Sequence, residues 1–185
     1  MDTKALFAVL LVAGILGGFS INNYLIEEDT TDIETETPVN NNVEKVEVGS
    51  EAPDFTLADT EGNQFNLSDY EGEKVLVLEF MNMNCGTCKS FEKNTMKSYC
   101  NESMPEDVEV ISITQTNNAN NDDLAERTEE MGWEFMKGNE QMTDAFGADR
   151  SPTVVIIDKD GIVTFSESGS MSKSELEEKI NDALE

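Results

Sequence analysis

The sequence predicts an α/β protein in which helices flank a central mixed β-sheet. Residues 75–81 (VLVLEFM) form a nearly continuous apolar run, which is typical of a strand buried on both faces. Residues 108–113 (VEVISI) repeat this character after a helical stretch. Strand, helix, strand and helix are then followed by a hairpin and a last helix, and this order indicates a layered α/β fold.

Each predicted element follows from its own pattern of apolar and turn-forming residues. Apolar runs separated by polar turn residues indicate strands and hairpins, whereas longer segments with helical periodicity indicate helices. The expected hairpins comprise residues 55–57 with 64–67 and residues 153–157 with 162–165, and the expected helices comprise residues 85–100, 121–132, 139–146 and 172–184.

Composition limits the classes of function. The 185 residues are 38% hydrophobic, which suits one globular domain with additional segments. Twelve Lys and Arg against 39 Asp and Glu give a net charge of −27, which argues against nucleic acid as a partner and predicts a solvated acidic surface. Histidine is absent, which excludes Ser-His and Cys-His catalysis and histidine-bearing zinc sites.

The apolar character of residues 1–26 predicts a membrane anchor or a signal segment. Residues 5–26 carry no charge, and roughly 20 apolar residues can cross a ~30 Å hydrocarbon layer. Lys4 precedes this run and acidic residues follow it, so the remainder of the chain is expected outside the cytoplasm. A cleaved signal peptide is the alternative, with Gly18 and Ser20 near the cleavage site, but the run is longer than an ordinary signal core.

An acidic linker and one domain are expected after this segment. Residues 27–46 are rich in Glu, Asp, Thr and Asn, with too little apolar surface to offset the entropy of ordering. The structured domain is expected over residues 47–185.

Two of the three cysteines, Cys85 and Cys88, are separated by two residues, which is consistent with a metal half-site, a structural crosslink or a redox couple. A zinc site lacks ligands, because Cys100 lies 12 residues beyond Cys88, about 18 Å along a continuous helix. Cys100 is therefore expected to act apart from the pair, either as a buried apolar thiol or as a regulatory or intermolecular thiol.

The position of the pair favours redox chemistry. A strand that ends at Met81 and turns into a helix at Cys85 places the first sulfur at a helix N-terminus, where free N–H groups favour a thiolate. Cys88, one turn deeper, can then attack a mixed disulfide within the same molecule.

Charged residues near the pair have two interpretations each. Lys89, Lys93 and Lys97 repeat every four residues, and they either form the solvent face of the helix or help to hold a thiolate. Glu79 interrupts the apolar strand. If its side chain points into the protein, its pKa should rise and it could accept the proton of Cys88; on a wet face it would be an ordinary surface residue.

Four stretches together resemble the thioredoxin superfamily, and more narrowly the extracytoplasmic TlpA-like thiol-disulfide oxidoreductases with a redoxin-like fold and an N-terminal tether. The resemblance covers residues 47–185. It rests on the order and spacing of VGSEAPDFTL (48–57), VLVLEFMNMNCGTCK (75–89), AERTEEMGWEFMKGNEQMTDAFGADRSPT (125–153) and SPTVVIIDKDG (151–161).

The resemblance implies a thioredoxin-like fold with an N-terminal β-hairpin extension and an inserted helix. It further implies that Cys85 is the exposed nucleophile, that Cys88 is the resolving cysteine, and that Pro152 follows a cis peptide bond and faces the pair. The peptide groups of Ser151 would pair with a substrate strand. Glu79 occupies the position of the buried carboxylate of thioredoxins.

This chain departs from the family pattern at three positions. Asn84 replaces the usual tryptophan before the first cysteine, and Arg150 stands where glycine is frequent, so the substrate-facing rim is altered. Thr87 replaces a common proline between the cysteines, which should change the redox potential.

The sequence therefore predicts a protein-disulfide oxidoreductase that uses the Cys85–Cys88 disulfide, with no other cofactor and no metal. Its expected partners are extracytoplasmic protein thiols and disulfides and an upstream redox partner such as a membrane electron-transfer protein. Two alternatives stay open: a Cu(I)-handling protein that adds Met81 and Met83 to the cysteines, and a thiol peroxidase of the redoxin type. The direction of electron flow does not follow from the sequence.

Overall fold

The computed structural model describes residues 45–115 and 119–185. The predicted membrane or signal segment, residues 1–26, lies outside the described residues, as does all but the end of the predicted linker. Within the described ranges, no helix is both long and apolar enough to cross a membrane.

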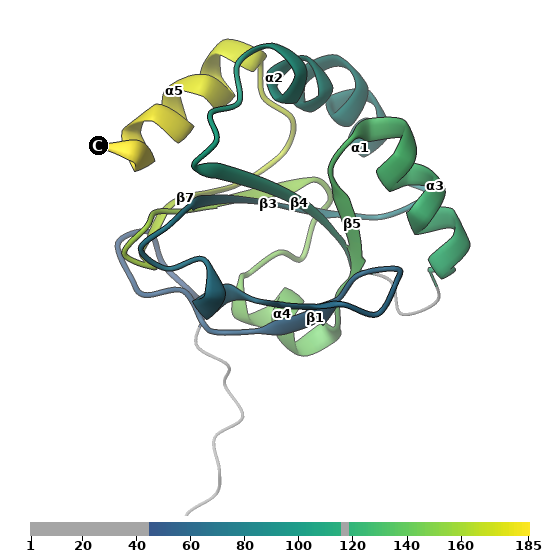
Figure 1. Ribbon diagram of the computed structural model, residues 1–185, viewed down its shortest axis with the longest axis horizontal. Helices are drawn as coiled ribbons and strands as arrows, with labels where there is room; N and C mark the ends of the chain where they lie inside the picture. The colour runs from purple at the N-terminus through teal and green to yellow at the C-terminus, as the bar shows by residue number, and fades with distance from the viewer. Residues whose placement is uncertain (1–44, 116–118) are drawn as a thin grey trace, which may run out of the picture. The chain divides into compact units, whose positions relative to one another are not determined.

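A five-stranded mixed sheet forms the centre of the domain and confirms the predicted fold class (Figure 1). Its strand order is β5-β4-β3-β6-β7, in which β3 runs parallel to β4 and antiparallel to β6. The strands comprise β3 (Val75–Met81), β4 (Val108–Thr114), β5 (Glu134–Lys137), β6 (Thr153–Ile157) and β7 (Val163–Ser168).

Helices cover one face of the sheet, and a hairpin with one short helix covers the other (Figure 1). The first group consists of α1 (Gly86–Phe91), α2 (Lys97–Glu102), α3 (Asn121–Met131) and α5 (Lys173–Leu184). The second consists of the antiparallel strands β1 (Thr56–Ala58) and β2 (Gln64–Asn66) together with α4 (Glu140–Ala145). The predicted N-terminal hairpin is thus confirmed.

The central strand β3 is buried along its whole length and supplies both halves of the core. Alternate side chains of a strand point to opposite faces. Val75, Val77 and Met81 pack with residues of α1, α2, α3 and α5, whereas Leu76 and Phe80 pack with the hairpin and α4. This alternation places Glu79 on the helix-covered face, among the residues that surround the cysteine pair.

The helix predicted over residues 85–100 is confirmed, with one irregularity. A π-helical segment, Glu92–Met96, joins α1 to α2. A π-helical turn contains an extra residue, and such turns occur often at functional sites. Glu92, the first residue of this segment, has a fully buried side chain.

The structure adds one strand, β5, that the pattern of residues does not predict. Gly132 ends α3 in the left-handed conformation at φ 91°, and the chain then pairs with β4 for four residues. Phe135 and Met136 are both buried, one on each face of the sheet. Two buried residues are too few to show the alternation of a strand in the sequence.

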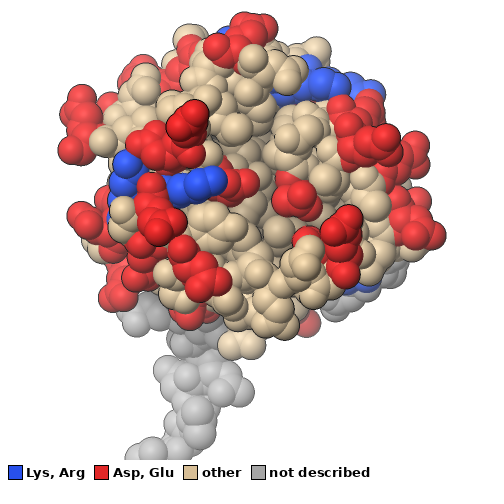
Figure 2. Space-filling model, viewed as in Figure 1, with Lys and Arg blue, Asp and Glu red and all other residues tan. Residues whose placement is uncertain are grey.

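The composition predicts an acidic surface, and one face of the domain shows this character. Figure 2 shows a face on which Asp and Glu side chains are spread widely and Lys and Arg are few.

Candidate active site

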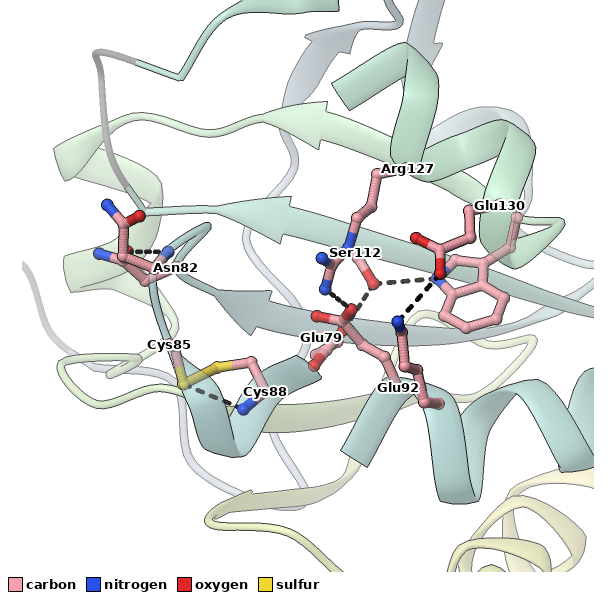
Figure 3. A network of polar contacts seen from close by, with 11 residues as sticks. Glu79, Asn82, Cys85, Cys88, Glu92, Ser112, Arg127 and Glu130 are labelled. Atoms are coloured by element: carbon pink, nitrogen blue, oxygen red, sulfur yellow. Dashed lines mark hydrogen bonds and ion pairs between the residues drawn. A yellow bond between two sulfur atoms is a disulfide. The ribbon is translucent and has the colours of Figure 1, made fainter. Parts of the chain in front are cut away.

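The cysteine pair lies at the junction between β3 and α1 (Figure 3). Cys85 is the N-cap residue of α1, which begins at Gly86. The side chain of Asn82 shapes the preceding turn, because its Oδ1 accepts a hydrogen bond from the backbone N–H of Asn84 at 2.9 Å. The backbone carbonyl oxygen of Asn82 accepts a second hydrogen bond, from the backbone N–H of Cys85 at 2.9 Å. The predicted strand-to-helix junction is confirmed, and Asn82 is a residue that the sequence analysis did not identify.

Cys85 and Cys88 form a disulfide, with their Cα atoms 5.3 Å apart. The Cys88 backbone N–H donates a hydrogen bond to Sγ of Cys85 at 3.0 Å. Cys85 is partly exposed, whereas Cys88 is fully buried. A partner can therefore reach the first sulfur but not the second. When the disulfide is reduced, the amide at the helix N-terminus favours the thiolate form of Cys85.

The loop before β6 faces the disulfide. The Ser151–Pro152 peptide bond is cis, as the family resemblance implies. The carbonyl oxygen of Ser151 lies 3.7 Å from Sγ of Cys85. Ser151 is partly exposed and Pro152 is buried, so the peptide groups of this loop border the accessible sulfur.

Gln115 connects this loop to the cysteine junction, and the sequence analysis did not identify it. Its side-chain amide donates hydrogen bonds to the carbonyl oxygens of Ala148 and Arg150, and its Oε1 accepts one from the hydroxyl of Ser151. Its backbone N–H donates to the carbonyl oxygen of Met81 at 2.9 Å. One side chain thus holds the loop against the end of β3. Its place directly after β4, at the carboxyl edge of the sheet, is the signal that could have indicated it.

Glu79 is fully buried on the cysteine side of the sheet, so the interpretation as a surface residue was wrong. Its Oε2 accepts a hydrogen bond from the hydroxyl of Ser112 at 2.5 Å, and that hydroxyl accepts one from Nε1 of Trp133 at 2.9 Å. Burial raises the pKa of Glu79 to about 7, although the Ser112 hydrogen bond and the charge of Arg127 lower it. The second carboxylate oxygen, Oε1, is buried without a hydrogen-bond partner.

A second buried carboxylate lies nearby (Figure 3). Glu92, on the π-helical segment, is fully buried and forms an ion pair with Nη2 of Arg127 from α3. Neither residue was identified from the sequence, because charged residues on helices are usually solvent-exposed.

The three lysines on the helix behave mainly as surface residues. Nζ of Lys93 lies 3.1 Å from a carboxylate oxygen of Glu130, and Nζ of Lys97 donates to the carbonyl oxygen of the same residue at 2.6 Å. These contacts attach the helix to the end of α3. Lys89 is exposed beside the cysteine pair.

Cys100 is a free, partly buried thiol that packs against the core. Burial raises its pKa to about 11, which keeps it protonated and agrees with an apolar role. Met81 is fully buried, and Met83 packs at the edge of the core. In residues 45–115 and 119–185, no three His, Cys, Asp or Glu side chains are grouped to hold a metal ion.

Comparison with known proteins agrees with this geometry. The model of the redoxin family matches residues 47–184. The chain belongs to the redoxin family. It is 33% identical over 143 residues to the thiol-disulfide oxidoreductase ResA of Geobacillus thermodenitrificans, a match that covers 73% of this chain and 77% of the relative. It is 30% identical to ResA of Geobacillus kaustophilus, over 94% of this chain and 91% of the relative.

Comparison with solved structures shows the same fold. A thiol:disulfide interchange protein of the thioredoxin family from Chlorobium tepidum superimposes with a TM-score of 0.61 at 20% identity, over 74% of this chain and 97% of that chain. Together with the Cys85–Cys88 disulfide, the relatives identify the chain as a protein-disulfide oxidoreductase that acts by thiol-disulfide exchange.

The raised pKa of Glu79 predicts a pH dependence of stability. The folded protein binds this proton more tightly than the unfolded chain, whose carboxyl has its ordinary pKa of 4.5. The stabilisation from the bound proton is therefore present below pH 4.5 and is lost as the pH rises through 7. Relative to wild type, Glu79→Gln should gain roughly 2 to 3 kcal/mol in unfolding free energy between pH 5 and pH 8.

Denaturant unfolding of the oxidised proteins at both pH values measures this difference. Glu129→Gln, which removes an exposed carboxylate of α3, is the control. An equal pH response of the two variants would contradict the assignment of a raised pKa to Glu79.

Proposed function

We propose that this chain exchanges electrons with extracytoplasmic client proteins, with Cys85 as the nucleophile and Cys88 as the resolving cysteine. The observation that carries the proposal is the disulfide itself, whose exposed sulfur caps a helix and faces the carbonyl of Ser151. An exposed sulfur followed by a buried one is the arrangement that a two-step exchange requires.

In the reducing direction, the thiolate of Cys85 attacks one sulfur of a client disulfide. The S–S bond of the client breaks, and its second sulfur leaves as a thiolate that takes up a proton from water. Cys88 then loses its proton and attacks the Cys85 sulfur of the mixed disulfide, which releases the second client thiolate. The client gains two electrons, and the enzyme is left with the Cys85–Cys88 disulfide. The oxidising direction is the reverse of these steps.

Glu79 is the proton acceptor for Cys88 in this mechanism. It lies on the same buried face of the sheet as Cys88. Its unpartnered Oε1 can hold a proton, and a pKa of about 7 allows it to bind and release that proton near neutral pH.

Ser151, Pro152 and Asn84 form the rim that contacts the client. An extended client segment can pair with the peptide groups of the 151–152 loop, as a strand is added to a sheet edge. Beside the exposed Asn84 is a shallow pocket of about 310 Å³ that Met83 and Lys89 also line. We expect side chains that flank the client cysteine to enter it. The exchange itself needs no cofactor besides the disulfide.

The extracytoplasmic location and the anchoring by residues 5–26 belong to the same proposal. The uncharged segment and the acidic residues after it support this orientation. The match to the Geobacillus kaustophilus relative covers 94% of the chain and so extends beyond the domain into the N-terminal segment.

The reduction potential of the Cys85–Cys88 pair decides the direction of electron flow. Equilibration with glutathione measures it. A potential near about −270 mV would suit a reductant of client disulfides, and one near about −120 mV an oxidant.

The order of attack predicts which cysteine variant traps a client. Cys88→Ser should accumulate a mixed disulfide with a disulfide-bonded peptide, because the resolving step is lost. Cys85→Ser should form none, since Cys88 is buried. Non-reducing electrophoresis and mass spectrometry identify the adduct. Adducts through Cys88 in the Cys85→Ser variant would contradict the assigned roles.

The proton-acceptor role predicts that Glu79→Gln slows turnover at pH 7. We expect a loss of about tenfold or more in the rate of exchange, because Gln cannot accept the proton. Reduction of a peptide disulfide, followed at several pH values, measures the effect. Unchanged rates would remove Glu79 from the mechanism.

The contacts of Gln115 predict an effect on client binding. Gln115→Ala removes the hydrogen bonds that hold the loop of Ser151, so KM for a protein disulfide should rise several-fold while kcat changes less. Gln141→Ala, at an exposed glutamine of α4, is the control. A fall in kcat at unchanged KM would show that Gln115 acts on the chemistry of the cysteines instead.

A further inference from the structure

Two buried carboxylates and one buried guanidinium lie on the side of the sheet that carries the cysteine pair. Glu79 and Glu92 are fully buried, and Arg127 is 8% exposed. Each carboxylate has one oxygen without a hydrogen-bond partner, and Nε of Arg127 also has none. The cluster therefore contains more potential negative charge than positive charge, in a largely buried region.

Three separate elements build the cluster (Figure 3). Glu79 comes from the middle of β3, Glu92 from the π-helical segment after the cysteines, and Arg127 from α3. Arg127 contacts Glu92 directly through Nη2. It also acts on Glu79, because its positive charge lowers the pKa of that carboxyl. Burial lowers the pKa of Arg127 itself, and the charges of Glu130 and Glu79 oppose that shift.

We propose that Arg127 is a positioning residue that divides its charge between Glu92 and Glu79 and thereby sets the pH at which Glu79 accepts the proton of Cys88. The proposal rests on the proposed function, which makes Glu79 the proton acceptor.

The balance of charges in the cluster explains why Glu79, and not Glu92, retains the proton. If both carboxylates were ionised, the cluster would hold one buried negative charge without a counterion, which is costly in a protein interior. Glu92 holds the direct ion pair with Arg127, so the proton that the cluster retains resides on Glu79. The two acids therefore compete for the charge of one cation, Arg127.

Other charged residues lie around Arg127, which lines a surface pocket together with Lys89, Asp123, Glu126 and Glu130. Ser112 on β4 donates a hydrogen bond to Glu79, Val154 is its apolar neighbour on β6, and Cys88 of α1 packs in the core on the same side of the sheet. Glu130 acts on Arg127 from the surface and is itself paired with Lys93.

Removing the acid of the ion pair and removing its cation should shift the pKa of Glu79 in opposite directions. Glu92→Gln removes the competing carboxylate and leaves the full charge of Arg127 to act on Glu79, so Glu79 should titrate about one pH unit lower. Arg127→Gln removes the cation, so Glu79 should titrate about one pH unit higher. Lys93→Gln, which breaks only the exposed pair with Glu130, is the control and should cause little change.

The titration is measured directly, without an activity assay. Carbon-13 NMR of side-chain carboxyls in the oxidised, full-length chain in detergent follows each glutamate, and Glu79 is assigned by the loss of its signal in Glu79→Gln. Opposite shifts support the proposal, whereas no shift, or shifts in the same direction, would overturn it. A merely structural role of the ion pair would not move the titration in two directions.

A second comparison applies if Arg127→Gln does not fold. The double variant Glu92→Gln/Arg127→Gln removes both members of the ion pair together, so neither is left buried without its partner. In this variant Glu79 should titrate at least about one pH unit higher than in Glu92→Gln alone, and equal titration would overturn the proposal.

The pH profile of disulfide exchange separates this inference from the proposed function. If the profile moves with the titration of Glu79, both are supported. If Glu79 titrates as expected in the variants but the profile stays fixed, the proton-acceptor role of Glu79 is wrong, while the control of Glu79 by Arg127 stands.

Discussion

The site depends on one constraint, the burial of the Glu79 carboxyl on an otherwise apolar central strand. A carboxyl without water needs compensation. Ser112 on β4 donates a hydrogen bond to Glu79, Trp133 just before β5 donates one to Ser112, and the positive charge of Arg127 on α3 favours the ionised carboxyl. These partners do not complete its hydrogen bonding, since Oε1 has none. Because these partners only partly offset the effect of burial, the pKa of Glu79 stays near neutral pH, where a proton acceptor is most effective.

The second requirement of the site is that two distant parts of the chain meet at one sulfur. The turn after β3 delivers Cys85, and the loop before β6 delivers Ser151. Antiparallel pairing of β3 with β6 brings the end of one strand next to the start of the other. Gln115 then joins both through its backbone and its side chain. The sheet topology thus determines which residues border the reactive disulfide.

The part of the site that is local in sequence could be predicted, and the part assembled from distant elements could not. Glu79 and the cysteines stand within ten residues on a clear strand-to-helix pattern. Gln115 is marked only by its place directly after β4. The role of Arg127 depends on tertiary contacts, so no local pattern marks it. Glu92 sits in the π-helical segment, where regular helical periodicity does not say which side chains face inward.

The net negative charge of the chain affects which molecules can exchange disulfides with it. Two copies of this chain, each with a formal charge of −27, repel one another, so self-exchange of disulfides between identical molecules is slowed. Cationic proteins are instead drawn in from a distance, and added salt weakens both effects. Long-range electrostatic interactions therefore favour the approach of cationic proteins to Cys85 over the approach of a second copy of this chain.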